Sequence, residues 1–578
     1  MKEKIISFFK AILTFISILI YCDSFLNSKS YNVLFTIGFF LLWYLFYNHD
    51  LKEKNKDFKA RKYSLLLSII FSILLSIGRI GVYIYSEPIN TFTFKNIFYV
   101  LLMMIGFIIM FFHLFIFLFE KIKNVSLISN HSKMKKRYFV LIFFVIFFSY
   151  AIYFVRFFPA IMTPDSYYVI HYANNFILSD FHTFGHTWFF GLPFHLFKML
   201  FSNLNLAVGF ATIVQMVCIS LAFSFVIRHL YNKGLSVKAT VLLVIIYSLN
   251  PLYAHYSVTL WRDVMFGTAF APLLICLFEL ISSKKLNKKY VVLFVITILT
   301  ILFFRNNGIY VFIFIIPFIL VFVKNHRLSM GILCGCILLF YIIIKGPVFD
   351  YFNVAKGKTV EAYSIPLQQM ARVVALDKKI EKNDKQFLEK LWNYDEVATS
   401  YKSITSDPIK NLTDGDFLRE NRVKFFKTYL HLMIQYPKIY VEAYLMETVG
   451  YWYPDVIYWA TGGESKSFFE TENVYSKPLT PKWYNNLIDL TTNRGLPLSN
   501  LLWSLGLALF ILIISSFVVS YRNKKYILCY IPLYGLWLSI MLSTPVFCEL
   551  RYVYGIFTCI PILLILPFII KKKEIEKI

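Results

Sequence analysis

The chain has 578 residues, of which 58% are hydrophobic and 16% charged, and its formal net charge is +26. A positive excess of this size is typical of proteins that bind nucleic acid. Here, however, the excess lies in short loops between apolar runs, and no nucleic-acid-binding motif accompanies it, so nucleic acid is excluded as a partner. Eight scattered cysteines without a CxxC pair indicate neither a zinc site nor a disulfide framework.

Apolar runs of roughly 16 to 24 residues recur along the chain, and each is long enough to cross a bilayer as a helix. We therefore predict an all-α, polytopic membrane protein with about fourteen transmembrane helices. The predicted helices lie near residues 5–22, 31–48, 63–86, 96–119, 137–158, 204–230, 239–257, 264–282, 290–304, 309–323, 328–344, 499–520, 526–543 and 553–570.

The connections between these runs predict the orientation, because Lys and Arg near helix ends are retained in the cytoplasm. Alternate connections are basic, namely 49–62, 120–137, 282–289, 522–525 and the tail 571–577. Both termini are therefore predicted to be cytoplasmic. This alternation requires that residues 184–201 do not span the membrane, and their Gly, Pro and His favour an interfacial or re-entrant element instead.

The pattern divides the chain into four predicted modules. Residues 1–136 form a four-helix membrane module, and residues 137–344 form a seven-helix module with an outer loop at 159–203. Residues 345–498 are predicted to form an extracytoplasmic, mostly helical soluble domain, in which 378–394 and 414–437 have the pattern of amphipathic helices. Residues 499–578 contribute three more helices and a basic cytoplasmic tail.

Short polar motifs gather on the predicted outer side, where residues distant in sequence can meet in one site. They are PDS (164–166), DFHTFGH (180–186), WRD (261–263), RNNG (305–308), SIPLQQMAR (364–372) and ELRY (549–552). The candidate site residues in these motifs are Asp165, His182, His186, Arg262, Asp263, Arg305, Asn306, Gln368, Gln369, Arg372, Glu549, Arg551 and Tyr552.

This layout resembles the GT-C superfamily of polytopic glycosyltransferases, in particular an uncharacterised bacterial branch of it. In that superfamily one helix, an outer loop with an essential Asp, interfacial helices and six more helices follow in order, and residues 137–344 share this order. SIPLQQMAR, RNNG and ELRY look like signatures of the branch, so the resemblance covers about 140–560. It implies a multi-pass protein of the bacterial cell membrane, a polyprenyl-phosphate-linked sugar donor, and an extracytoplasmic glycan, lipid or protein as acceptor.

The acidic motif departs from better-known relatives of this superfamily, because a single Asp is followed by Ser where they have a DD or DE pair. No cofactor is therefore expected to be required, although a divalent cation, Mg²⁺ or Mn²⁺, at the phosphate stays open. The chemistry of the transfer independently needs a base for the acceptor hydroxyl and cations for the departing phosphate. Asp165 is the predicted base of an inverting single displacement. The predicted phosphate ligands are Arg262, Arg305, Arg372 and Arg551.

Several of these residues have a structural alternative. Asp165 could cap a helix, Arg262 and Asp263 could form an interfacial ion pair, and Arg551 could pair with Glu549. RNNG could be a tight turn, and the Gln and Arg side chains of SIPLQQMAR could belong to an ordinary surface helix. His182 and His186 are four residues apart, a spacing that permits metal ligation, but no third ligand or HExxH pattern accompanies them, so hydrogen bonding to substrate is favoured and no metal site is predicted.

Two other classes of function remain open. A transporter or flippase for a lipid-linked or cell-envelope substrate would also be polytopic, and such proteins place ionisable groups near the middle of the bilayer. A non-catalytic membrane scaffold or sensor would use residues 345–498 as a binding module, but it would not explain the polar motifs.

Overall fold

A computed structural model of the chain describes residues 2–23, 33–52, 57–86, 94–181, 183–283, 285–355, 357, 359–456, 458–459, 474–492 and 499–570. These residues form helices, and β-structure among them is limited to isolated bridges. In hydrocarbon a helix satisfies its own backbone hydrogen bonds, which explains this bias in so apolar a chain.

A helix lies at each of the fourteen predicted apolar runs. They are α1 (Lys2–Asp23), α2 (Val33–Lys52), α3 (Phe58–Ser86), α4 (Phe94–Ile122), α5 (Lys136–Arg156), α8 (Leu204–Asn232), α9 (Val237–Leu249), α11 (Arg262–Ser282), α12 (Lys288–Phe304), α13 (Gly308–Phe322), α14 (Arg327–Ile343), α25 (Leu505–Asn523), α26 (Ile531–Ser543) and α27 (Tyr554–Ile569).

Nine helices in the described part of the chain are long and apolar enough to span a membrane, and a tenth span results if α9 is joined to α10 (Pro251–Ser257) across a 51° bend. The prediction of a polytopic helical membrane protein is therefore confirmed, whereas the count of fourteen is not. Four of the five predicted helices outside these nine, α9, α12, α13 and α26, have only 13 to 17 residues, and the fifth, α2, has 20. A 13-residue helix such as α26 is only about 20 Å long, against a hydrocarbon thickness of about 30 Å.

The basic loops meet at one end of the helices, which we call the basic end. The amide of Leu127 donates to the Phe568 carbonyl, and that of Ser236 to the Leu127 carbonyl. Arg522 donates to the Ile122 carbonyl at 2.7 Å. The motif-bearing loops meet at the opposite end, the site end, where Thr183 donates to the Phe304 carbonyl at 3.0 Å. The two sets of loops thus segregate as the charge pattern predicts, while the side that faces the cytoplasm stays a prediction.

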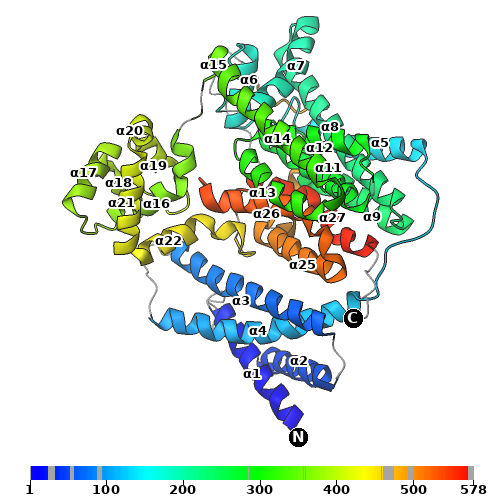
Figure 1. Cartoon of the computed structure of the whole chain (residues 1–578), viewed down its shortest axis with the longest axis vertical. Helices are drawn as coiled ribbons and strands as arrows, with labels where there is room; N and C mark the ends of the chain where they lie inside the picture. Colours follow the sequence, from blue (N-terminus) through cyan, green and yellow to red (C-terminus); the bar gives the residue numbers. More distant parts are fainter. Residues whose placement is uncertain are drawn as a thin grey trace.

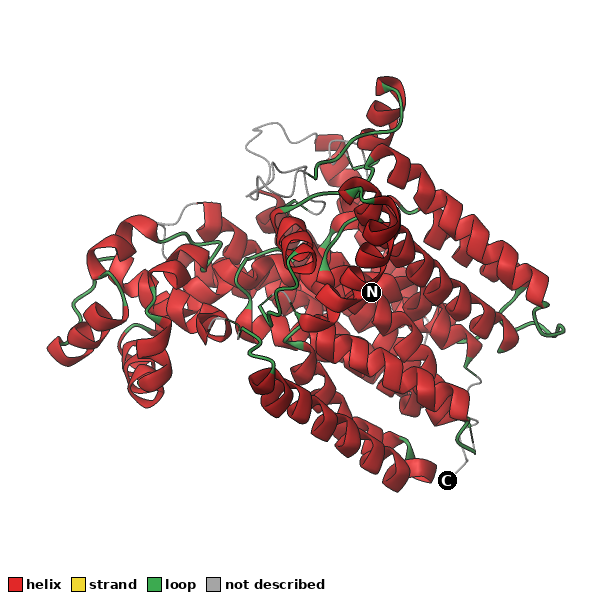
Figure 2. Ribbon diagram, turned by 90° about the horizontal axis from the view of Figure 1, so that it is seen from above, coloured by secondary structure: helices red, strands yellow, loops and turns green. Residues whose placement is uncertain are grey.

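A separate helical bundle stands to one side of the membrane helices in both views (Figure 1, Figure 2). We call it the outer bundle. It has its own hydrophobic cluster, drawn from residues 360–440. Its elements are η3 (Thr359–Tyr363), α16 (Ser364–Ala375), α17 (Lys382–Leu391), α18 (Tyr394–Ser400), α19 (Asp407–Leu412), α20 (Gly415–Glu420), α21 (Arg422–Gln435) and α22 (Pro437–Thr448).

The remainder of the predicted domain 345–498 that is described packs with the membrane helices. Arg156 at the end of α5 pairs with Asp489 of α23 (Lys482–Leu490) at 3.1 Å. The predicted helix 414–437 is divided into α20 and α21, and Asp414 caps α20 by accepting from the amides of Asp416 and Phe417. The other short elements are η1 (Lys324–His326), η2 (Ile344–Val348), α15 (Phe349–Tyr351), η4 (Val449–Tyr451), α24 (Ser499–Trp503), η5 (Lys524–Cys529) and η6 (Leu550–Val553).

Two helices, α6 (Pro164–Asn174) and α7 (Phe184–Phe201), lie between α5 and α8 at the site end. They share a hydrophobic cluster with the start of α8. The far half of α7 exposes large apolar side chains, including Leu192, Met199 and Leu200, and α7 is not among the candidate spans. An exposed apolar face on a helix that does not span is typical of an element lying in the membrane surface.

The core between α11 and α27 depends on glycine. A Cβ atom at Gly267 would lie 2.6 Å from Cδ1 of Tyr554 and 2.9 Å from the amide nitrogen of Gly555. The two helix backbones can therefore approach closely only because Gly267 has no side chain. This contact joins the helix that begins with Arg262 to the one that follows Arg551.

We expect Gly267→Ala to destabilise the protein by about 1–3 kcal/mol, because the added methyl group forces these backbones apart. Gly335→Ala is the matched control, since a Cβ at that position meets nothing within 4 Å and alanine favours a helix over glycine. Thermal unfolding followed by intrinsic fluorescence in detergent measures both variants. Equal melting temperatures for the two would contradict the close packing.

Candidate functional site

Asp165 lies in the first turn of α6, but it does not cap this helix. Thr163 is the N-cap, its hydroxyl accepts from the Ser166 amide, and the Ser166 side chain completes a capping box. Pro164 occupies the beginning of the helix, where its missing N–H costs nothing. Thr163 and Ser166 therefore cap α6 in place of Asp165, and the Asp165 carboxylate pairs with other residues.

The loop that carries Asp165 is bonded to the loop before α11. The Trp261 indole N–H donates to the Thr163 hydroxyl at 2.7 Å. The Ile161 amide donates to the Val258 carbonyl at 2.9 Å, and the Ser166 hydroxyl donates to the Leu260 carbonyl at 3.2 Å. These buried bonds fix the start of α6 against the start of α11, two segments that lie about a hundred residues apart.

Arg551 joins Asp165 to Glu549. Its Nη1 forms an ion pair with Asp165, and its Nε lies 3.1 Å from Oε1 of Glu549. The guanidinium also lies over the Trp261 ring, 5.1 Å from the centroid. The side chains are 36% exposed at Asp165, 16% at Arg551 and 3% at Glu549. The carboxylate of Asp165 is thus the outermost group of this row.

A second pair lies beside the first. Nη1 of Arg305 is 2.6 Å from Oδ1 of Asp263, and both side chains are largely buried. The Arg305 guanidinium lies over the Tyr552 ring at 4.4 Å, and Arg551 lies 5.2 Å from the same ring. Tyr552 is therefore the shared aromatic surface of the two arginines.

A third group of polar side chains extends the site along the ends of α12 and α14. Lys345 forms an ion pair with Asp180 and donates to Oδ1 of Asn306 at 3.0 Å. Asn306 in turn donates to the Asp180 carbonyl at 3.2 Å. Arg262 donates to the neighbouring Phe181 carbonyl, so it does not form the pair with Asp263 that their adjacency suggested.

The site therefore holds four cationic and four carboxyl side chains, which we call the charged cluster. Its members are Arg262, Arg305, Lys345 and Arg551 with Asp165, Asp180, Asp263 and Glu549. Electrostatic interactions connect them. Besides burial, the charges of Asp165 and Arg305 both shift the pKa of Glu549. The charge of Arg262 repels those of both Arg305 and Lys345.

Burial raises the pKa of the Glu549 carboxyl to about 8, against the opposing effect of Arg551. At neutral pH this group is therefore mainly protonated. Four cations then face three carboxylates, and the charged cluster has one net positive charge. A buried site with this balance favours an anion such as a phosphate.

Most of the predicted site residues come together in this cluster, including Asn306 and Tyr552 beside its charged members. Three do not. Arg372 is buried in the outer bundle with Glu442 at 3.1 Å, Gln368 donates to the Lys402 carbonyl, and Gln369 donates to the Tyr440 carbonyl. Their bonds stabilise the bundle. All three side chains are buried, so α16 is not the ordinary surface helix that the structural alternative for SIPLQQMAR assumed.

The two histidines of the DFHTFGH motif have different outcomes. His186 is fully buried near the start of α7, and its ring contacts Phe304 with a centroid distance of 6.0 Å. His182 lies outside the described residues. Within the described residues, no group of three or more His, Cys, Asp and Glu side chains could hold a metal ion.

Sequence reasoning missed Lys345 and left Asp180 without a role. Lys345 is the first charge after the long apolar run of α14, in IIIKGP. A lysine at that position is usually assigned to the membrane boundary. Its position could have identified it, because Lys345 lies on the predicted outer side of the membrane, where lysine at helix ends is scarce.

The ELRY loop is held by the outer bundle and by η4. The Ser406 amide donates to the Pro545 carbonyl at 2.9 Å, and the Phe547 amide donates to the Ile404 carbonyl at 3.0 Å. The buried Tyr451 hydroxyl accepts from the Glu549 amide at 3.1 Å and donates to the Val546 carbonyl at 2.8 Å. Residues 404–406 and Tyr451 therefore set the position of Glu549 and Arg551.

A family described as "Family of unknown function (DUF6020)" matches residues 149–577, about three quarters of the chain. The chain belongs to this family. No curated protein and no solved structure matches it. The matched residues include all eight members of the charged cluster, whereas the first four helices precede them.

The raised pKa of Glu549 predicts a pH dependence of stability. An ordinary glutamate ionises near pH 4.5 in the unfolded chain, whereas Glu549 keeps its proton in the folded protein up to about pH 8. The folded state therefore binds more protons between these values, and stability is lost as the pH rises through this window. We expect the melting temperature of the wild type to fall between pH 5 and 8, and that of Glu549→Gln to fall less.

The measurement is a series of melting curves in detergent at half-unit pH steps. Glu361→Gln is the control, because its carboxylate is partly exposed and paired with Lys410 at 2.6 Å. A parallel pH dependence in wild type and Glu549→Gln would show that Glu549 ionises normally.

Proposed function

We propose that this protein is an integral membrane glycosyltransferase that moves a sugar from a polyprenyl-phosphate donor to an extracytoplasmic acceptor. The observation that supports it best is the meeting of Asp165 with Arg551 and Arg305 at one end of the helices. A base beside phosphate-binding cations, at a membrane surface where a lipid-borne head group would lie, is what this transfer requires.

In the proposed reaction Asp165 takes the proton of the acceptor hydroxyl as its oxygen forms a bond to the anomeric carbon. The bond between that carbon and the phosphate oxygen breaks, and the electron pair leaves with the polyprenyl phosphate. Attack and departure occur on opposite faces of the sugar, so the configuration inverts. The phosphate gains one negative charge, which Arg551 and Arg305 stabilise.

The ion pair between Asp165 and Arg551 has a place in this mechanism. A paired carboxylate is a weak base, because the guanidinium favours its ionised form. A phosphate bound between Arg551 and Arg305 would compete for the guanidinium and so raise the basicity of Asp165. The base would therefore become active only when donor is bound.

The location of the proposed reaction follows from the charge rule. If the basic end faces the cytoplasm of a bacterial cell, the site end and the outer bundle lie outside it. The acceptor would then be a cell-wall glycopolymer, a lipid or a protein. The outer bundle, which contacts the ELRY loop, is the candidate surface for that acceptor. The cation requirement is a separate question, so the assay below is run with Mg²⁺, with Mn²⁺ and with a chelator.

We expect Asp165→Asn to lower sugar transfer at least about 100-fold, because the amide cannot accept the proton. The measurement is transfer of radiolabelled sugar from polyprenyl-phosphate donors to membrane or polymer acceptors in vesicles with the full-length protein. Asp489→Asn is the matched control, since Asp489 lies at the same end and pairs with Arg156. Transfer by Asp165→Asn at the wild-type rate would show that Asp165 is not the base. No transfer by the wild type with any donor would contradict the proposed glycosyltransferase activity.

One observation favours transport as a second candidate. Nζ of Lys10 lies 2.9 Å from Nε2 of His113, in a contact between α1 and α4. Lys10 is about 12 Å along α1 from Lys2, and α1 and α4 are both candidate spans, so the contact lies within two helices that are able to cross a membrane. Ionisable groups within such helices are typical of transport pathways.

Transport predicts that Lys10→Gln abolishes movement of a lipid-linked sugar across the membrane, because the polar contact between these helices is lost. Asp165→Asn should leave that movement unchanged. A flip assay in vesicles, with a reagent that modifies only outer-leaflet sugar, measures both variants. Equal flipping by Lys10→Gln, wild type and protein-free vesicles would exclude this candidate.

A further inference from the structure

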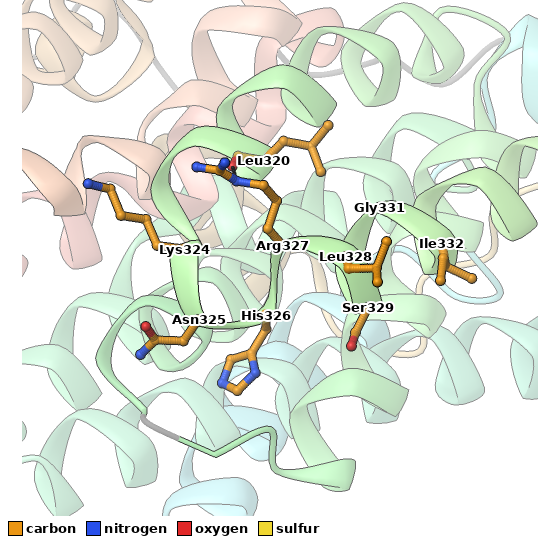
Figure 3. Close-up of a pocket in the computed structure, with 9 residues that line it drawn as sticks. All are labelled: Leu320, Lys324, Asn325, His326, Arg327, Leu328, Ser329, Gly331 and Ile332. Atoms are coloured by element: carbon orange, nitrogen blue, oxygen red, sulfur yellow. Dashed lines mark hydrogen bonds between the residues drawn. The ribbon is translucent and has the colours of Figure 1, made fainter.

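An open cleft of about 690 Å³ lies at the basic end, between the end of α13 and the first turns of α14 (Figure 3). It is far from the charged cluster along the helices, because α13 runs from the site end, beside Arg305, to the basic end. The transferase proposal therefore does not use it. Its lining combines three basic side chains with an apolar wall.

The basic part of the lining comes from the short turn between the helices. Lys324, His326 and Arg327 all border the cleft. Nε of Arg327 donates to the Leu320 carbonyl at 2.6 Å, and Figure 3 shows its side chain reaching back to that residue. This bond fixes the guanidinium plane and leaves its two terminal nitrogens for an anion. Nε2 of His326 is shielded from solvent and has no hydrogen-bond partner among the described residues.

The apolar part of the lining runs along α14 away from the basic turn. Leu328 and Ile332 are 78% and 59% exposed, and Leu320 of α13 faces them across the cleft. Ile332 is five residues beyond Arg327, about 7 to 8 Å further into the membrane. Only 17% of this span is buried inside the protein, the lowest share of the nine candidate spans in the described chain. The apolar wall is therefore open to lipid.

We propose that this cleft is a binding site for one anionic phospholipid of the leaflet at the basic end. The phosphate would bind Lys324 and Arg327, and an acyl chain would lie along Leu320, Leu328 and Ile332. Cations at the surface directly above an exposed apolar groove match the two parts of such a lipid. A soluble phosphate would use the cations but not the groove. Cations that serve only to set topology need neither an oriented guanidinium nor a groove.

The test is a titration of the detergent-purified full chain with phosphatidylglycerol, read as the rise in melting temperature that a ligand of the folded state causes. We expect a saturable rise with phosphatidylglycerol and none with phosphatidylcholine. Lys324→Gln/Arg327→Gln should bind at least tenfold more weakly. Lys133→Gln/Lys135→Gln is the matched control, because it removes the same charge from another exposed basic loop and should bind like wild type.

A further variant separates a lipid from a free anion. A Cβ at Gly331 would lie 3.2 Å from Cδ2 of Leu320, so Gly331→Leu fills the groove while both cations stay. We expect it to lose the response to phosphatidylglycerol. An equal response to inorganic phosphate, or to glycerol phosphate, would overturn the lipid as occupant. If binding of phosphatidylglycerol weakens equally in both double variants, or does not weaken in Lys324→Gln/Arg327→Gln, the cleft is not the binding site. A melting temperature equal to that of the wild type, measured in phosphatidylcholine, shows that a variant is folded.

Discussion

The hydrogen bond from the Trp261 indole to the Thr163 hydroxyl links the three segments from which the site is built. Thr163 begins the helix that carries Asp165, and Trp261 directly precedes Arg262 and Asp263. The face of the same indole ring supports the Arg551 guanidinium. A single buried side chain thus aligns parts of the chain that lie up to almost 400 residues apart. Both side chains are buried, so the loss of this bond would leave buried polar atoms without partners.

Much of the architecture follows from the sequence because a bilayer allows few solutions. Apolar runs must become helices, and charged loops must collect at the ends, so both the helical fold and the segregation of the loops were predictable. The number of spans was not, because hydropathy does not report where a helix ends. α13 continues the apolar pattern of a span but has only 15 residues, and α9 is interrupted at Asn250 and Pro251.

The site was predictable where position in the sequence restricts the partners. Charges at the ends of membrane helices collect on one side of the membrane, which is why Asp263, Arg305, Glu549 and Arg551 were identified as candidates. Arg372 shows the opposite case. It lies in a polar stretch where many partners are available, and its partner Glu442 is 70 residues away, on a helix whose packing no local pattern reveals. Similarly, the sequence suggested Asp165 as a possible cap of α6, and the backbone geometry instead gives the cap to Thr163.

The outer bundle is connected to the charged cluster by backbone as well as side-chain bonds. Residues 404–406 pair with residues 545–547 in a short antiparallel bridge, and the Ser406 hydroxyl donates to the Pro545 carbonyl at 3.3 Å. In η4, directly after the bundle, the Tyr451 hydroxyl accepts from the amide of Glu549. A displacement of the bundle would therefore act on Arg551 through only a few residues of loop. In the proposed transferase this connection gives an acceptor that binds the bundle a direct route to the group that pairs with the base.

The charge balance of the cluster suits the proposed transfer at each stage. With Glu549 protonated, the cluster has one positive charge in excess, which a phosphodiester donor with one negative charge neutralises. During transfer Asp165 gains a proton while the departing phosphate gains a negative charge, so one negative charge is lost at Asp165 and one appears on the phosphate. Arg551 can pair with both groups, so it needs to move little during the reaction. Glu549 keeps its proton because it is buried, and an ionised carboxylate there would compete with the phosphate for the same guanidinium.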